Sequence, residues 1–226
     1  MIYFRNLLYN IIKYVSKSGV SMNINTTYTK IITGEDLMET AQHGSTLYPF
    51  QFYYEDLSVF DFNCIEWHWH TELEFIYIES GTVTLWIGED QFHLTEGNGI
   101  FINTKVLHRL YSPSKALIPN FVFMPSFIAP CDSLIYQKYI LPIISSSLPF
   151  LVFHKKVCWQ AKVLSIMRQI ISAQDSVLSK ELLTSSLLQN LWLEIFENTD
   201  ISYQEEHKDH STASQARLQL MLQFIH

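Results

Sequence analysis

The chain has 226 residues, of which 48% are hydrophobic and 14% aromatic, and its formal net charge is −7. This composition excludes an intrinsically disordered chain, and the length allows one large domain or two smaller ones with a real core. An acidic chain without a dense cluster of lysine and arginine is also not, as a whole, a binder of nucleic acid or another polyanion.

Cysteine usage and hydropathy predict a cytoplasmic protein. The chain has an odd number of cysteines, which lie far apart in the sequence and form no Cys-x-x-Cys pair: Cys64, Cys131 and Cys158. This pattern fits reduced thiols in the cytoplasm better than a disulfide framework. No uninterrupted apolar run reaches the roughly 18 residues that a membrane-spanning helix needs, so we expect no membrane partner.

Residues 1–22 allow two interpretations, because apolar side chains recur there at helical spacing. One is an amphipathic helix on a membrane surface. The other is that Met22 is the true start and that the preceding residues are an extension that is not native. A secretory signal is not expected, since the stretch lacks a continuous apolar core and a cleavage site.

The chain from residue 23 onward reads as an arm followed by a β-rich region. The arm, residues 23–62, is expected to be partly extended, with strands over 26–28 and 50–54. From Ile65 to Met124, short apolar runs alternate with turn signals, which predicts an antiparallel sandwich or barrel rather than alternating β–α–β units. The turn signals are Glu79–Gly81, Gly88–Asp90, Glu96–Gly99 and Ser112–Ser114, and we expect the all-β part to end near Pro125.

A polar motif lies in the middle of this region. His68 and His70 are two residues apart, so in one extended strand both point to the same face. Glu74 has the same parity and joins them if the strand continues. The strand-forming run Phe75–Ile78 follows, and Gly81 can supply the turn that ends it.

A second motif completes the pattern. The glycine-rich turn Glu96–Gly99 precedes the strand-like Ile100–Ile102, and His108 comes after it. A neighbouring strand would bring His108 to the first motif as a third imidazole. Such a polar centre needs a pocket, a metal or a ligand to offset the cost of its burial.

The two motifs, His-x-His-x-x-x-Glu-x6-Gly and the later glycine-rich turn with its downstream histidine, resemble those of the cupin barrel. The sequence from His68 to Leu110 resembles, more narrowly, the effector-binding domain of bacterial transcription regulators of the arabinose-operon (AraC) family. The likeness extends more loosely from about Ser45 to the last residue. It implies a mainly β chain with C-terminal helices, in which residues 23–153 form a cupin-like antiparallel β-barrel (jelly roll) that binds an effector.

The pattern changes after the barrel strands. Residues 132–144 predict a short helix that is stopped by Pro142, and Phe150–Phe153 predicts a short strand. Apolar positions over 163–171 recur at the helical spacing and predict a longer helix, which a break at 172–176 ends.

A second long helix is predicted after this break, with Ser179 as its N-cap. Two amphipathic helices joined by a short break make a helical hairpin over residues 154–198. The resemblance implies that helices in this position form a homodimer interface. The side chains expected to form it are Leu183, Leu187, Leu188, Leu191 and Ile195.

The last part of the chain is polar and then helical again. Residues 199–213 are mostly acidic and predict a linker. Residues 214–226 resemble the opening helix of the family's helix-turn-helix DNA-binding domain, whose recognition helices are absent from this sequence. We therefore expect contact with promoter DNA only through that missing domain.

Three interpretations remain open for His68, His70, Glu74 and His108. The four groups suit a divalent transition metal, although no cofactor is required. The resemblance also allows them to hydrogen-bond an effector, for example a sugar, without a metal, and they are equally open to a purely structural role. Trp86 is either an ordinary barrel aromatic or a stacking platform for the effector.

The remaining histidines carry weaker expectations. His93 lies on a strand near the second motif and can face the lumen or solvent. We expect the others, which fall in loops, in the linker or at the terminus, to be solvated; they are His43, His154, His207, His210 and His226.

The leading hypothesis is the ligand-sensing and dimerisation part of an AraC-type regulator, which is not an enzyme. The alternative is a metal-dependent cupin enzyme, a dioxygenase or isomerase whose site consists of three histidines and one glutamate. A third hypothesis is a modulator that only dimerises with full-length partners. No Gly-x-Ser-x-Gly elbow and no nucleotide-binding glycine loop is present, so hydrolase and nucleotide-binding functions have no motif behind them.

Overall fold

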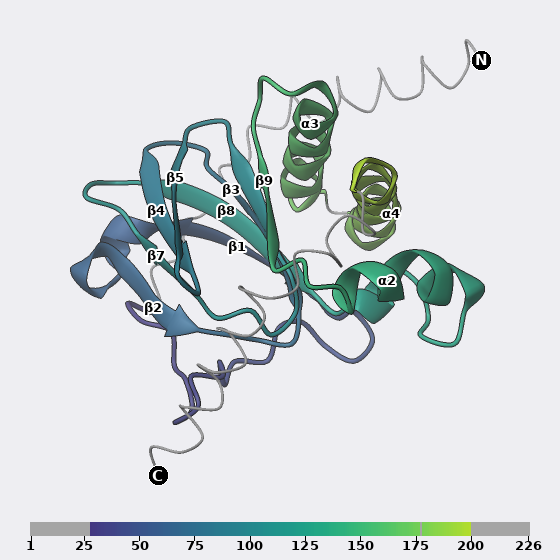
Figure 1. Cartoon of the computed structure of the whole chain (residues 1–226), viewed down its shortest axis with the longest axis horizontal. Coiled ribbons are helices and arrows are strands. Elements are labelled where there is room, and N and C mark those ends of the chain that lie inside the picture. Colours follow the sequence, from purple (N-terminus) through teal and green to yellow (C-terminus); the bar gives the residue numbers. More distant parts are fainter. Residues whose placement is uncertain (1–27, 177, 200–226) are drawn as a thin grey trace.

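The computed structural model describes residues 28–176 and 178–199 (Figure 1). Several expectations concern residues 1–27 and 200–226 and lie outside these ranges. They are the amphipathic N-terminal stretch, most of the first predicted strand, nearly all of the linker with His207 and His210, and the terminal helix with His226. Tyr28, the last residue of that predicted strand, lies in no strand.

Strands within the described residues form two antiparallel sheets. One has the order β1-β8-β3-β6-β9 and the other the order β2-β7-β4-β5. The strands are β1 (Phe50–Asp56), β2 (Cys64–His68), β3 (Leu73–Tyr77), β4 (Thr82–Ile87), β5 (Asp90–Thr95), β6 (Gly99–Ile102), β7 (His108–Tyr111), β8 (Leu117–Phe123) and β9 (Phe150–Phe153). The two sheets enclose the barrel interior, which confirms the predicted antiparallel jelly-roll fold with helices after it.

The alternation of side chains along these strands gives the molecule two separate cores. Between the sheets lies an aliphatic core, to which Ile76 and Ile100 contribute from one sheet and Leu85 and Leu110 from the other. The opposite face of the five-stranded sheet is aromatic and packs against the helices. The predicted turn at Gly81 is confirmed: its φ is +86°, and a Cβ there would lie 2.6 Å from the carbonyl oxygen of Lys115.

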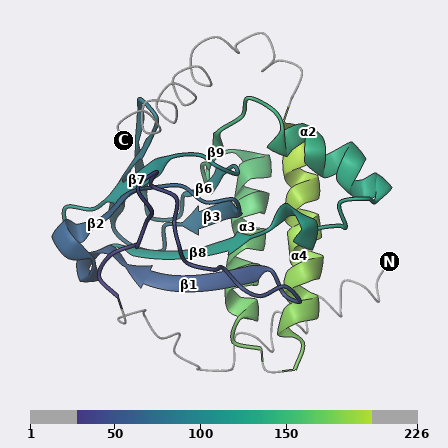
Figure 2. The same cartoon turned by 90° about the horizontal axis from the view of Figure 1, so that it is seen from below.

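One helical segment lies between β8 and β9, and two longer helices follow β9. They are a short helix that includes α2 (Leu141–Ile144), and the longer helices α3 (Cys158–Ala173) and α4 (Lys180–Asn198). Figure 2 shows α3 and α4 side by side along one face of the five-stranded sheet, as the predicted hairpin requires. Within the described ranges, no helix is both long and apolar enough to cross a membrane.

Pro142 does not stop the first helical segment, and that prediction is wrong. It is the second residue of α2, and the preceding residues Tyr136–Ile140 are wound as a π-helix. Proline interrupts a regular α-helix because it lacks an N–H and its ring meets the carbonyl one turn back. A turn of wider winding before it changes that hydrogen-bond pattern and allows the helix to continue.

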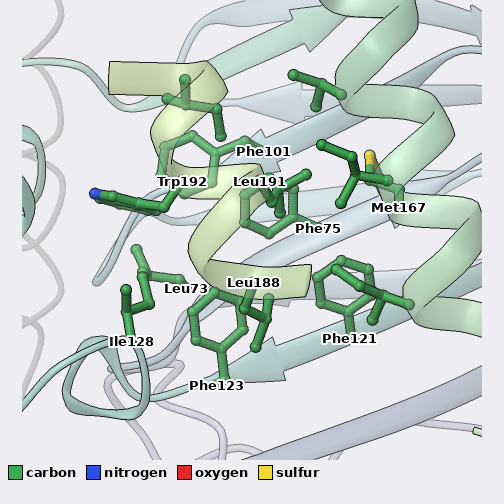
Figure 3. Packing of buried hydrophobic residues seen from close by; sticks show 14 of the residues in the cluster. Leu73, Phe75, Phe101, Phe121, Phe123, Ile128, Met167, Leu188, Leu191 and Trp192 are labelled. Carbon is green, nitrogen blue, oxygen red and sulfur yellow. The ribbon is translucent and has the colours of Figure 1, made fainter. Parts of the chain in front are cut away.

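The aromatic core joins the helices to the sheet (Figure 3). Phe75 and Phe101 project from β3 and β6 toward α4, where the Trp192 ring lies edge-on to Phe101 at 6.0 Å. The indole nitrogen of Trp192 donates a 2.8 Å hydrogen bond to the carbonyl oxygen of Tyr139. Since β3 is buried at every residue, it serves both cores: Phe75 faces the helices, and its neighbours Glu74 and Ile76 face the barrel interior.

Candidate functional site

The four residues of the predicted polar motif converge, but they do not lie on one strand. His68 ends β2 in the four-stranded sheet, His70 lies in the following loop, and Glu74 lies on β3 in the five-stranded sheet. His108 opens β7 and pairs with His68 across a register shift. The single-strand expectation is therefore wrong: the chain crosses between the sheets after His68, and the group forms where the sheets meet.

The convergence is close and buried. Ligand nitrogens of His68, His70 and His108 all lie within 4.8 Å of one another. The Oε2 atom of Glu74 lies 3.4 Å from His70 Nε2 and 3.2 Å from His108 Nε2. None of the four residues is more than 7% exposed, so bulk water does not solvate the cluster.

Each histidine ring is oriented by a backbone carbonyl two residues away. The Nδ1 atoms of His68, His70 and His108 lie 2.8, 3.2 and 2.8 Å from the carbonyl oxygens of Glu66, Glu72 and Val106. Because a carbonyl oxygen only accepts, each Nδ1 carries a hydrogen. Each Nε2 is therefore the atom left for a ligand, a neighbour or a metal.

Burial and mutual contact perturb the protonation of this cluster. Burial, with repulsion from the other two imidazoles, holds the pKa of His68 well below its ordinary value. Burial also disfavours charge on His70, but its contact with the Glu74 carboxylate outweighs this and raises its pKa. The Glu74 pKa is lowered, because His108 and His70 outweigh the cost of burying the carboxylate. An internal ion pair of Glu74 and His70 follows.

A divalent transition metal fits this donor set. Three imidazoles and a carboxylate are donors that such metals take. Although His108 Nε2 lies 3.2 Å from Glu74, the geometry is not that of a hydrogen bond, and this buried nitrogen has no hydrogen-bond partner among the described residues. Buried polar atoms are rarely left this way. His68, His70, His108 and Glu74 would hold the ion.

The cluster faces a cavity inside the barrel, with about 400 Å³ of space free of protein atoms, part of it open to solvent. One wall is aliphatic, and the N-terminal segment before β1 contributes polar residues to another. The lining residues are Tyr28, Ile31, Glu39, His43, Tyr53, Glu55, Ile65, His68, His70, Glu74, Ile76, Leu110, Ile118, Asn120 and Val122.

His43 is buried in this cavity, and the expectation that it is solvated is wrong. Only 7% of the residue is exposed. Its Nδ1 lies 2.8 Å from the hydroxyl of Tyr53, and its ring lies edge-on to His70 with 5.7 Å between the centroids. Burial disfavours its charged form, yet the nearby Glu39 carboxylate raises its pKa. No spacing motif signals His43, since it comes from an irregular segment.

A further acidic group at the cavity is absent from the sequence predictions. Glu55 accepts hydrogen bonds from the Tyr28 hydroxyl at 2.5 Å and from Asn120 Nδ2 at 3.1 Å. Burial raises its pKa to about 7. A signal exists in the sequence, because Glu55 shares the parity of Tyr53 and directly follows the predicted strand over 50–54.

Two of the five predicted effector contacts, His108 and Trp86, do not line the cavity. Trp86 is not among the lining residues; the guanidinium of Arg109 lies 4.9 Å above its ring. His93 is exposed and contacts Thr84 Oγ1 at 3.1 Å, and His154 is exposed as expected.

The predicted dimer side chains need a correction. Leu188, Leu191 and Ile195 are at most 1% exposed and belong to the aromatic core of the monomer. Figure 3 shows Leu188 and Leu191 packed in this core. Leu183 and Leu187 are half-buried. Three of the five side chains therefore cannot contact a second copy, because the five-stranded sheet of the same chain already covers the apolar stripe of α4.

A jelly-roll barrel with three histidines and a glutamate clustered in its interior defines a cupin-type ligand-binding domain. Residues 51–192, more than half of the chain, match the family described as the AraC-like ligand binding domain. The protein belongs to this family, which makes it the ligand-binding part of a transcription regulator and answers the choice between regulator and enzyme in favour of the regulator.

Individual proteins are also similar to this chain. It is 24% identical over 200 residues, 86% of its length and 67% of the other's, to YdeC of Bacillus subtilis (strain 168), an uncharacterized HTH-type transcriptional regulator. Among solved structures it is similar to an RmlC-like cupin from Shewanella frigidimarina (17% identity, 34% of this chain and 67% of that one, TM-score 0.31). It is also similar to ToxT from Vibrio cholerae (11% identity, 70% and 58%, TM-score 0.47).

Proposed function

We propose that this chain senses a small-molecule effector in the barrel cavity, next to His68, His70, Glu74 and His108, and dimerises to control a DNA-binding domain. The convergence of these four groups carries the proposal. All four are buried, three of them (His68, His70 and Glu74) line an internal cavity of an AraC-type ligand-binding domain, and His108 Nε2 lies 3.2 Å from the Glu74 carboxylate behind them. The sugar effector that the resemblance implies stays a prediction.

The route for a signal runs through β3. Glu74 faces the cavity, and the next residue, Phe75, packs under α4. An effector that binds one arrangement of this strand and its helices more tightly than another shifts the balance between the two. Helix-turn-helix domains C-terminal to α3 and α4 would then be repositioned on promoter DNA.

The homodimer uses the outer face of α4 in this proposal. Leu182 and Leu193 are 76% and 48% exposed there, unlike the buried leucines of the same helix. A contiguous exposed apolar patch marks an association surface, and in this proposal the two leucines contribute to one. A regulator of this kind acts where its promoter DNA is, so we place it in the cytoplasm.

The unpartnered Nε2 of His108 supports a second role for the cluster, the binding of a divalent transition metal. Such an ion would supply a Lewis acid to which an oxygen or nitrogen atom of the effector binds. The protein would contribute the orientation of the three rings through their carbonyl-bound Nδ1 atoms, and Glu74 would contribute negative charge.

Elemental analysis tests the metal. Protein loaded with Zn²⁺ and then dialysed should retain about one ion per chain, and His68→Ala with His70→Ala should lose it, because two of three imidazole ligands are gone. Mass in solution is measured on the same samples. Retention of the ion by the double variant would contradict the assignment of these ligands.

Effector binding is tested by thermal shift with a panel of sugars, amines and carboxylates. His70→Ala and Glu74→Ala should lose the shift that the wild type shows with its best compound, while remaining folded and of unchanged mass. Glu89→Ala, an exposed carboxylate in the turn between β4 and β5, is the matched control. A full shift in both cavity variants would move the effector site elsewhere.

A further inference from the structure

The cavity has a second polar end, distant from the histidine cluster. On β8, Val122 pairs with Glu74 of β3, whereas Ile118 pairs with Glu55 of β1. Val122 and Ile118 are four residues apart, which corresponds to roughly 13 Å along an extended strand. Glu74 and Glu55 therefore enter the cavity from positions offset along β8, and aliphatic side chains such as Ile118 and Val122 also line it.

Glu55 is a buried carboxylate without a cationic partner. It is 4% exposed and accepts hydrogen bonds from Tyr28 and Asn120, both uncharged. Among the residues that the structure describes, no lysine or arginine lines the cavity and none forms an ion pair with Glu55. The adjacent Asp56, by contrast, pairs with Lys115 at 3.4 Å. A buried carboxylate without a counter-charge is costly.

A second observation points to a ligand in the same space. The Nε2 atom of His43 is buried and has no hydrogen-bond partner among the described residues, although Glu39 Oε2 lies 3.3 Å away. His43 lines the cavity and is bonded to Tyr53, which pairs with Asn120 between the two ends. An unsatisfied buried nitrogen in a cavity wall indicates a partner that the protein itself does not supply.

We propose that the Glu55 end of the cavity binds the ammonium group of a small organic amine, whose apolar body extends between the aliphatic walls toward the histidine cluster. The inference rests on the proposed effector site and specifies its ligand class. An ammonium group supplies the missing counter-charge and donates to the carboxylate. A carboxylate or phosphate at this end would meet the Glu55 carboxylate, and no described arginine or lysine lines the cavity to bind it.

The test compares amine, alcohol and carboxylate versions of the same carbon skeleton. Suitable sets are tyramine, tyrosol and 4-hydroxyphenylacetate; glucosamine, glucose and glucuronate; and 1-aminohexane, 1-hexanol and hexanoate. Affinity is measured by thermal shift and titration calorimetry at pH 7 on the full chain. In at least one set, we expect the amine to bind roughly tenfold or more tightly than its alcohol and carboxylate, as a charge-assisted hydrogen bond at a desolvated site predicts.

Glu55→Gln locates the contact. It keeps the shape of the side chain and should reduce amine affinity roughly tenfold, whereas Glu89→Gln on the surface should leave it unchanged. The comparison of amine, alcohol and carboxylate uses the wild-type protein alone. It therefore tests the proposal even if the Glu55→Gln protein fails to fold.

The outcomes separate this inference from the proposed function. Preference for an alcohol or a carboxylate in every set that binds overturns the amine and leaves the effector site standing. An amine preference that persists in Glu55→Gln also overturns the inference, because the ammonium then lies elsewhere. If no compound of any class binds here or in the wider panel, the inference and the effector site are overturned together.

Discussion

At the scale of single residues, each imidazole of the cluster takes its orientation from the local chain. The three Nδ1 atoms are held by carbonyl oxygens two residues away, so no distant element is needed to fix a ring or its tautomer. Distant elements contribute the environment instead. Glu74 arrives from the other sheet, and its carboxylate opposes the effect of burial on His70.

Glu55 should make the stability of the protein fall as pH rises. Its pKa is raised from 4.5 to about 7 by burial, so between these values the folded state holds a proton that the unfolded state has released. The contribution is fully present below about pH 4.5 and lost above about pH 7, a change of order 3 kcal/mol. Urea unfolding from pH 5 to pH 8 measures it.

Glu55→Gln is the matched variant for this measurement. It removes the titration, so it should gain stability relative to wild type as pH rises, while His43 and His70 titrate in both proteins. A stability difference that stays constant from pH 5 to pH 8 would show that the pKa of Glu55 is close to its ordinary value.

At the scale of elements, α4 has two faces that serve different purposes. Leu188 and Leu191 complete the core over the five-stranded sheet (Figure 3). Leu182 and Leu193, by contrast, are exposed. Both sets contain the same kind of residue on the same helix. Only the position of the sheet distinguishes them.

Leu191→Ala should destabilise the fold by about 2–5 kcal/mol, because it leaves a cavity in a core where the side chain is 0% exposed. Leu182→Ala, on the outer face, should change the free energy of unfolding by no more than about 0.5 kcal/mol. Urea denaturation at low protein concentration measures both. Equal losses for the two variants would contradict the assignment of faces.

The sequence predicts a good part of this architecture, and the failures have physical causes. The β-rich jelly roll, the turn at Gly81 and both long helices follow from side-chain periodicity and turn residues. The prediction that Pro142 stops the helix failed, because a local change of helical winding is not visible in residue identities. The apolar stripe of α4 predicts burial but does not say whether a sheet or a second copy covers it.

Only part of the candidate site can likewise be predicted from the sequence. His68, His70, Glu74 and His108 stand at a recognisable spacing, and the structure brings them together even though the strand between them is broken. His43 and Glu39 come from a segment without periodicity. Their place in the cavity depends on how that segment lies over the barrel, which no local pattern encodes.

At the scale of the whole molecule, one sheet separates two cores. The cavity lies on one side of the five-stranded sheet and the aromatic core on the other. Figure 2 shows the helical pair along this second side, so a single sheet and one layer of helices separate the cavity from the outer face of α4. Communication between them requires no long pathway.

Leu182→Glu combined with Leu193→Glu should convert the proposed dimer to a monomer, because two charges would be buried against their symmetry mates. Mass in solution by light scattering measures this. Phe62→Glu, at a side chain that is 91% exposed on the barrel, is the control and should leave the mass unchanged. A dimer that persists in the double variant would place the interface on another surface.

The complete burial of β3 has an evolutionary consequence. With no exposed position from Leu73 to Tyr77, the strand has no site at which substitutions can accumulate neutrally. Glu74 and Ile76 of this strand line the cavity, so a new effector that requires changes there also alters the buried barrel. Tyr28, Glu39 and His43 reach the cavity from a segment that belongs to neither sheet, and there natural selection can revise ligand specificity without altering the barrel.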